Sequence, residues 1–131
     1  AKYLGVDLVL CHKQRAKANV VESMKIIGDV QGKNVIILDD MVDTAGTITK
    51  AADLMIENGA LSVRAFASHG VLSDPATERI EKSKLTAIYF TDSIPLKKES
   101  EKIKVLSVAD LIANTIINVN TNKSISSSYL V

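Results

Sequence analysis

Residues 35–49 read VIILDDMVDTAGTIT, and this stretch decides which fold the chain can adopt. Four apolar residues lead into Asp39 and Asp40, a pattern typical of a buried β-strand with an acidic end. Asp43 follows, and then residues 44–47, which are rich in turn-forming residue types. Because a helical pattern begins directly afterwards, the stretch predicts a strand, a turn and a helix in immediate succession.

Similar apolar runs occur three more times along the chain. They read VDLVL from Val6, VRAFAS from Val63 and AIYFT from Ala87. Because these runs are continuous rather than alternating with polar residues, they predict parallel strands that are covered on both faces. Helical segments lie between them, so we expect an α/β fold with a mostly parallel sheet and flanking helices.

The expected helices have recognisable signals at their ends. The first repeats apolar residues at helical spacing from Ile48 and stops at Gly59. The second is expected to begin at Asp74-Pro75, with Asp74 as the N-cap, and the third at residues 107–110, which resemble a capping box. Its apolar positions share one face: Leu111, Ile112, Ile116 and Val119.

Two segments lie outside this pattern. Residues 12–20, HKQRAKANV, are basic and have no usable apolar period, so a mobile loop is expected there. The opening AKYLG has the form of a helix end closed by Gly5, from which we expect the chain to be a piece of a longer protein.

Composition excludes several classes of function. The chain has 131 residues, which fits one domain, and a net charge of +1, which gives no support to nucleic-acid binding. No apolar stretch approaches membrane-spanning length. The single cysteine, Cys11, permits no intramolecular disulfide, so we expect a reducing, cytoplasmic location.

The acidic strand end and the turn after it suggest a ligand with two unlike ends. Ligands of parallel α/β sheets sit at the carboxyl ends of the strands, and the start of the helix after Thr47 offers backbone N–H groups to a phosphate. Gly46 is expected to let the backbone approach this anion or adopt a positive φ. Ionised aspartates repel phosphate and instead accept from hydroxyls or bind a metal, so a ribose 5-phosphate moiety fits both. The alternative is that Asp40 and Asp43 are ordinary turn and capping residues.

The longer pattern resembles a known family. Residues 35–47 resemble the phosphoribosyl-binding motif of the type I phosphoribosyltransferase fold, and residues 12–60 are similar to ribose-phosphate pyrophosphokinase. The likeness continues through SHGVLSDPATERIEKS, TDSIPL, KIKVLSVADLIANTI and the serine-rich end. It covers residues 1–131 as the carboxyl-terminal domain of that enzyme, which implies an amino-terminal domain preceding residue 1.

That family transfers the diphosphoryl group of ATP to the 1-hydroxyl of ribose 5-phosphate. The resemblance implies a catalytic pair, Lys13 and Arg15, carried on one face of an extended loop. Asp39 would bind the ribose hydroxyls, whereas Asp40 need not, because successive side chains of an extended chain point opposite ways. The loop implied to hold the 5-phosphate consists of Asp43, Thr44, Ala45, Gly46 and Thr47.

The resemblance also implies partners. These are ATP, Mg²⁺ and other copies of the chain in a hexamer, with the magnesium ligands and purine pocket in the missing amino-terminal part and no metal ligand in this chain. The 131 residues alone are therefore expected to be inactive. Ser126 and Ser128 are candidates for binding a regulatory phosphate.

Three other functions remain open at this point. A phosphoribosyltransferase would use a similar phosphate loop, but the Lys13–Arg15 pair and the segments after residue 67 argue against it. A catalytically silent regulatory homologue should have lost the basic pair or the acidic loop. An unrelated sugar-phosphate binding module would bind the ligand without turnover.

Overall fold

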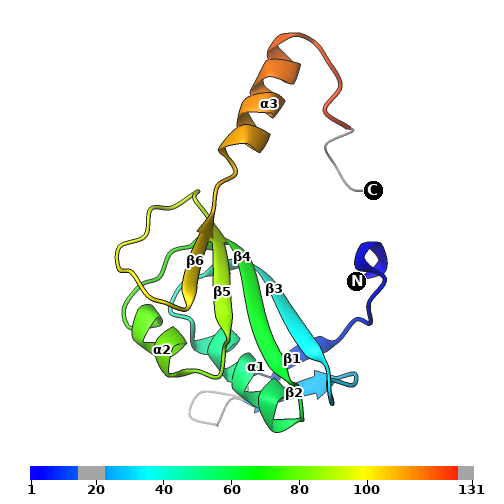
Figure 1. Ribbon diagram of the computed structural model, residues 1–131, viewed down its shortest axis with the longest axis vertical. Coiled ribbons are helices and arrows are strands. Elements are labelled where there is room, and N and C mark those ends of the chain that lie inside the picture. The colour runs from blue at the N-terminus through cyan, green and yellow to red at the C-terminus, as the bar shows by residue number, and fades with distance from the viewer. Residues whose placement is uncertain (15–22, 127–131) are drawn as a thin grey trace.

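The computed structural model describes residues 1–14 and 23–126, and the side chains of Lys13, Gln14 and Ser23 are not described. Figure 1 shows the arrangement of its elements. In chain order they are η1 (Lys2–Leu4), β1 (Leu10–Gln14), β2 (Ser23–Ile27), β3 (Asn34–Val42), α1 (Gly46–Glu57), β4 (Ser62–Gly70), α2 (Ala76–Lys82), β5 (Ala87–Thr91), β6 (Ile103–Leu106) and α3 (Ala109–Asn120).

The centre of the molecule is a four-stranded parallel sheet in the order β3-β4-β5-β6. Connections between parallel strands are almost always right-handed, so a sheet that grows in one direction carries its connecting helices on one face. Figure 1 accordingly shows α1 and α2 on the same side of the sheet. The predicted α/β fold with a parallel sheet and flanking helices is confirmed.

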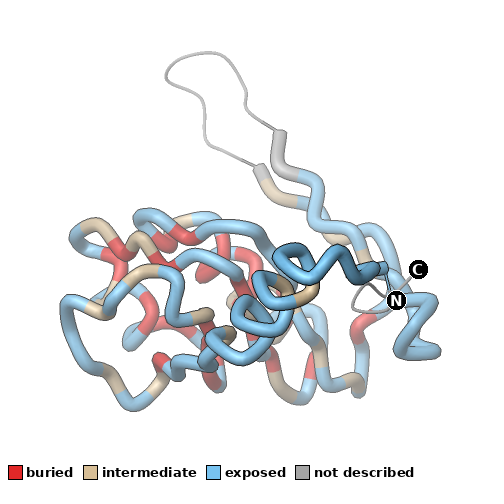
Figure 2. Tube along the Cα trace, turned by 90° about the horizontal axis from the view of Figure 1, so that it is seen from above, coloured by how far each residue is buried: buried red, intermediate tan, exposed pale blue. Residues whose placement is uncertain are grey.

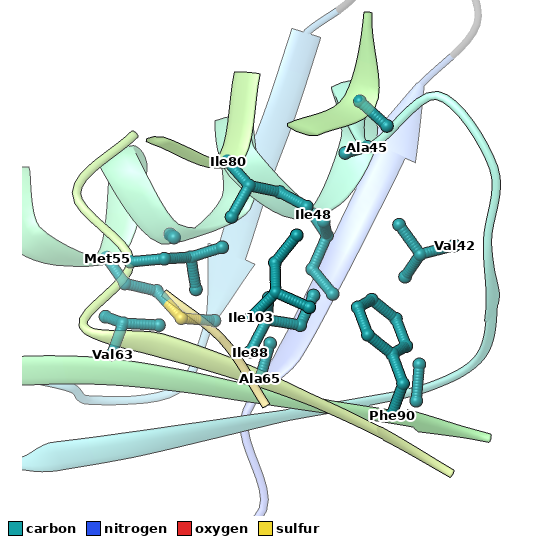
Figure 3. Close-up of a cluster of buried hydrophobic side chains, with 14 of the residues drawn as sticks. Val42, Ala45, Ile48, Met55, Val63, Ala65, Ile80, Ile88, Phe90 and Ile103 are labelled. Atoms are coloured by element: carbon teal, nitrogen blue, oxygen red, sulfur yellow. The ribbon is translucent and has the colours of Figure 1, made fainter. Parts of the chain in front are cut away.

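The hydrophobic core fills the space between these two helices and the sheet. Figure 3 shows Ile48 of α1 and Ile80 of α2 above Ala65 and Ile88 of the central strands. The largest fully buried side chains are Phe90, Ile80, Leu85, Ile88 and Val63. Because the apolar residues of α1 recur every three or four positions, its buried set forms one stripe that faces the sheet.

The opposite face of the sheet is open among the described residues. Ile36 and Leu38 of β3 are 54% and 71% exposed. The register places Leu38 beside Phe66, and Phe66 beside Tyr89, whose ring stacks on it with centroids 4.6 Å apart. The prediction that the strands are covered on both faces is wrong here, because both connecting helices lie on the other side.

The amino-terminal part differs from the expectation. The run from Val6 does not form a buried parallel strand: Val6 and Leu8 are exposed, and β1 begins only at Leu10. β1 pairs with β2 in an antiparallel hairpin outside the main sheet. Residues 12–14 of the predicted loop therefore belong to a strand. The predicted helical ending is confirmed as the 3-10 turn η1, which Gly5 closes with a φ of 62°.

The helix starts also differ in detail. The N-cap of α2 is Pro75 rather than Asp74, and no side chain caps this helix. Asp74 instead accepts a hydrogen bond from Lys98 Nζ at 2.8 Å, which holds the pKa of Asp74 below its usual value. The N-cap of α3 is Val108 rather than Ser107. The Ser107 hydroxyl still accepts from the N–H of Ala109 at 3.3 Å, but the return bond from Asp110 that completes a capping box is not among the described hydrogen bonds.

The carboxylate of Asp92 fixes the residues at the start of α3. It accepts hydrogen bonds from the hydroxyl of Ser107 and from the N–H of Val108, at 3.0 Å for the latter. These two bonds lower the pKa of Asp92. The carboxylate at the end of β5 thus joins the sheet to the start of the last helix.

Helix α3 stands away from the sheet. Figures 1 and 2 show it projecting from the end of β6, with most of its surface exposed. None of its residues is buried, including the predicted apolar face of Leu111, Ile112, Ile116 and Val119. In the part of the chain that the structure describes, no helix is long and apolar enough to cross a membrane.

The close packing at the carboxyl end of β4 generates a prediction. A Cβ added at Gly70 would lie 2.9 Å from Cγ of Phe90, so Gly70→Ala is expected to lower the free energy of unfolding by about 1–3 kcal/mol. Gly46→Ala is the matched control, because a Cβ there would meet Arg79 Nη1 at an ordinary 3.5 Å. Urea unfolding of both variants checks this; equal stability would show that Phe90 moves aside freely.

Candidate functional site

The acidic strand leads into α1 through a short loop at the carboxyl edge of the sheet. β3 runs on past Asp39 and Asp40 to Val42, two residues further than the acidic pair. The carbonyl of Val42 accepts from the N–H of Leu72 at 3.2 Å, which ties the loop to the segment after β4. Asp43 and Thr44 then follow as exposed bends, so the predicted strand, turn and helix meet at this edge.

The turn depends on Ala45. Its φ of 58° and ψ of 5° place it in the left-handed region, where side-chain-bearing residues are uncommon. Gly46, for which either a close approach to the anion or a positive φ was expected, begins the helix and is not among the residues with positive φ. Ala45, whose methyl is 3% exposed, adopts the left-handed conformation instead, and the close approach at Gly46 stays a prediction.

The first turn of α1 has the properties of an anion site. Ala45 is the N-cap and has no side-chain acceptor, and there is no acidic residue in the first turn. A helix start of this kind presents N–H groups and a positive dipole end to a ligand. Thr44 and Thr47 are exposed beside it.

The two strand aspartates lie where the alternation of β3 ends, and both are exposed. Along β3, Val35 and Ile37 are half-buried and Ile36 and Leu38 are exposed, so odd positions face the helices. The register pairs Asp39 with Ala67, which is buried on that face, so Asp39 continues the face that α1 covers. The alternation ends there, because Met41 is exposed and Val42 is buried, and Asp40 is not assigned to a face by it. Asp39 Oδ1 also accepts from the N–H of Asp40 at 2.9 Å. The structure therefore brings Asp39 to the same face as the loop.

Arg79 is a further residue of this edge that sequence reasoning missed. Its Nη1 donates to the carbonyl oxygen of Thr44 at 2.9 Å, across 35 residues of sequence. No local sequence pattern predicts this contact, because the side chain reaches the loop only when α2 packs beside α1.

A polar cluster continues along the same edge. His69 lies beside Met41 in the register of β4 and β3, and its Nδ1 is 2.8 Å from the hydroxyl oxygen of Ser93. That hydroxyl and the one of Thr91 both donate to the carbonyl of Ser68, at 3.1 Å and 2.6 Å. His69 is therefore held in place by the residues that follow β5.

The remaining predicted residues lie in β1, near the carboxyl end of the described chain, or outside the described residues. Lys13 lies in β1, its side chain is not described, and Arg15 lies outside the described residues. Ser126 is exposed, and its N–H donates to the hydroxyl of Ser124 at 3.2 Å. Ser128 also lies outside the described residues. These assignments stay predictions.

The described side chains do not build a metal centre. Within residues 1–14 and 23–126, no group of three or more His, Cys, Asp or Glu side chains is placed to hold a metal ion. Asp39, Asp40 and Asp43 are all exposed and do not form such a group. These residues therefore do not fit a magnesium site by themselves.

Fold and site together define the class of the domain. It is a parallel α/β domain whose acidic strand end and left-handed turn lie where such sheets bind their ligands. A family model described as the phosphoribosyl synthetase-associated domain matches residues 9–131, and the chain belongs to this family.

Individual relatives agree with that assignment. The chain is 60% identical over 129 residues to a ribose-phosphate pyrophosphokinase of Porphyromonas gingivalis, covering 98% of this chain and 41% of the relative. A relative of the same name from Wolinella succinogenes is 55% identical over 130 residues, covering 99% and 42%. Phosphoribosylpyrophosphate synthetase from Mycobacterium smegmatis matches the structure with a TM-score of 0.82 and 41% identity, over 92% of this chain and 39% of that one.

The chain thus spans about two-fifths of the length of these relatives. The comparisons do not support the prediction that it is their carboxyl-terminal half. They establish the family of the chain and the fraction of the relatives' length that the chain covers.

The strained turn generates a prediction about Ala45. Ala45→Val adds a branched side chain at a positive φ inside the core, and is expected to lower the free energy of unfolding by about 2 kcal/mol. Ala45→Gly relieves the left-handed conformation while removing a buried methyl, so it should change that free energy by less than about 1 kcal/mol. Urea unfolding compares them. A valine variant as stable as the glycine variant would contradict the left-handed turn.

Proposed function

We propose that this chain supplies the ribose 5-phosphate site of a ribose-phosphate pyrophosphokinase. The reaction transfers the diphosphoryl group of ATP to the 1-hydroxyl of ribose 5-phosphate, giving phosphoribosyl pyrophosphate and AMP for nucleotide biosynthesis. One observation carries the proposal: Asp39 and the uncapped start of α1 share one face of the sheet edge. The high identity to enzymes of that name supports the same conclusion.

The chemistry of the ligand follows from these two features. A phosphate accepts hydrogen bonds from the backbone N–H groups of residues 43–47 and is stabilised by the helix dipole. A carboxylate only accepts, so Asp39 receives the ribose hydroxyls and repels the phosphate. The sugar is thereby oriented with its phosphate on the turn and its hydroxyls toward β3. Asp40 is the weaker candidate, because successive side chains of an extended chain point opposite ways.

Catalysis is proposed to depend on the basic pair Lys13 and Arg15. Phosphoryl-type transfer is promoted by positioning and by stabilising the charge around an in-line transition state. A lysine ammonium and an arginine fork complement the oxygens of the transferred diphosphoryl group. Lys13 lies near the end of β1, in a hairpin that is separate from the main sheet.

ATP, Mg²⁺, a hexameric assembly and a cytoplasmic location belong to the same proposal. The described residues hold no metal cluster, so magnesium would be bound with the nucleotide by groups beyond them, and it supplies charge neutralisation of the phosphates. Ser126 and Ser128 are proposed to bind a regulatory phosphate. Because the chain spans two-fifths of its relatives, we expect these 131 residues alone to bind ribose phosphate without completing the reaction.

The experiment that tests this function is AMP formation from ATP, Mg²⁺ and ribose 5-phosphate by the complete protein that contains this chain. The double variant Lys13→Ala, Arg15→Ala should lose several powers of ten in kcat, since both transition-state charges disappear. Lys17→Ala is the control from the same basic segment and should keep its activity. A parent without turnover would favour the silent regulatory homologue, and an active double variant would remove the pair from the mechanism.

Gly46 provides a test of the phosphate loop that is separate from the basic pair. Gly46→Ala adds a methyl inside the proposed phosphate loop, 3.5 Å from Arg79 Nη1 and 3.9 Å from Thr44 Oγ1. We expect the KM for ribose 5-phosphate to rise about tenfold or more, as for the loss of one charged hydrogen bond, while the KM for ATP stays within about twofold. A normal KM for ribose 5-phosphate would place the phosphate elsewhere.

A further inference from the structure

We propose that Arg79 is a positioning residue for the phosphate loop. The proposal rests on the ribose 5-phosphate site described above and adds to it a residue of α2, outside the loop itself. It starts from the strain at Ala45. A residue with a side chain keeps a left-handed conformation only where its surroundings determine that conformation.

The two peptide groups that flank Ala45 are both held from outside the turn. On the strand side, the carbonyl of Thr44 accepts the 2.9 Å hydrogen bond from Arg79 Nη1. On the helix side, the carbonyl of Ala45 accepts from the N–H of Thr49 at 3.1 Å and from its hydroxyl at 2.7 Å. Thr49 is buried, so its hydroxyl has a fixed partner. The peptide planes before and after Ala45 are therefore both fixed.

The bond from Arg79 sets the direction of a donor. In a planar trans peptide the C=O and the following N–H point in opposite directions. Because the carbonyl of Thr44 is turned toward Arg79, the N–H of Ala45 is turned away from it. Without that bond, the peptide plane can rotate and bring its carbonyl oxygen to the place where the N–H should meet an anion.

The position of the guanidinium suits this role. A Cβ added at Gly46 would lie 3.5 Å from Arg79 Nη1, so the positive charge stands beside the loop at ordinary contact distance. Arg79 is exposed and forms no ion pair among the described residues, whereas Lys82, one turn along α2, pairs with Glu78. The described contact of Arg79 is thus with the loop backbone and not with an acid of its own helix.

The test uses Arg79→Gln, Arg79→Lys and the matched control Lys82→Gln in the complete protein. All three variants are compared by steady-state kinetics, with ribose 5-phosphate and with unphosphorylated ribose, and by thermal unfolding. Arg79→Gln should raise the KM for ribose 5-phosphate about tenfold and leave the KM for ATP and the midpoint of unfolding as in Lys82→Gln. Its preference for the phosphorylated sugar over ribose should fall by the same factor. Arg79→Lys, which can still donate to the carbonyl, should recover part of the loss.

The other possible results show whether the role of Arg79 or the proposed function is the part that fails. If the parent is active and Arg79→Gln keeps its KM for ribose 5-phosphate, the positioning role is overturned and the function stands. A fall in the midpoint of unfolding with equal effects on both substrates would also overturn it, since Arg79 would then be structural. If the parent has no turnover, binding of inorganic phosphate is measured by calorimetry. Weaker binding by Arg79→Gln than by Lys82→Gln supports the inference, and equal or absent binding contradicts it.

Discussion

The left-handed turn at Ala45 is the constraint on which the site depends. β3 arrives at the carboxyl edge of the sheet, and α1 must leave at once to cover the sheet face that carries the core. The turn occupies residues 43–45, and Ala45 as the N-cap leaves the start of α1 without a side-chain cap. Because Arg79 and Thr49 hold the carbonyls on either side, the strained residue is fixed by two different helices. The packing of α1 and α2 is therefore linked to the geometry of the loop.

The order of the strands explains why polar groups gather at this edge. β3, β4, β5 and β6 are neighbours in sequence and in space, so all their carboxyl ends meet along one side. Asp39, His69 and Asp92 come from three consecutive strands or their ends. The same order places α1 and α2 on one face and leaves Leu38, Phe66 and Tyr89 on the other. One topological feature thus produces both the polar edge and the open apolar face.

The sequence was informative where local pattern and tertiary packing agree. The apolar runs of β3, β4 and β5 and the periodicity of α1 predicted those elements, because each buries a face against the same core. The run from Val6 failed, since apolar composition alone does not say whether a strand has neighbours in the sheet. The acidic end and the turn were also visible in the sequence. The left-handed residue was not predicted, because glycine is the residue expected in that conformation and Ala45 adopts it instead.

The role of Arg79 could not be predicted from the sequence for a different reason. Its contact with Thr44 joins residues 35 positions apart and forms only when α2 packs beside α1.

The central proposal is that one sheet edge orients a sugar phosphate: Asp39 repels the phosphate group, and the turn binds it. A crystal structure of the complete protein with ribose 5-phosphate tests this most directly. It should show the phosphate on the backbone N–H groups of residues 43–47 and the ribose hydroxyls on Asp39. A sugar bound with its hydroxyls on the turn, or bound away from this edge, would contradict it.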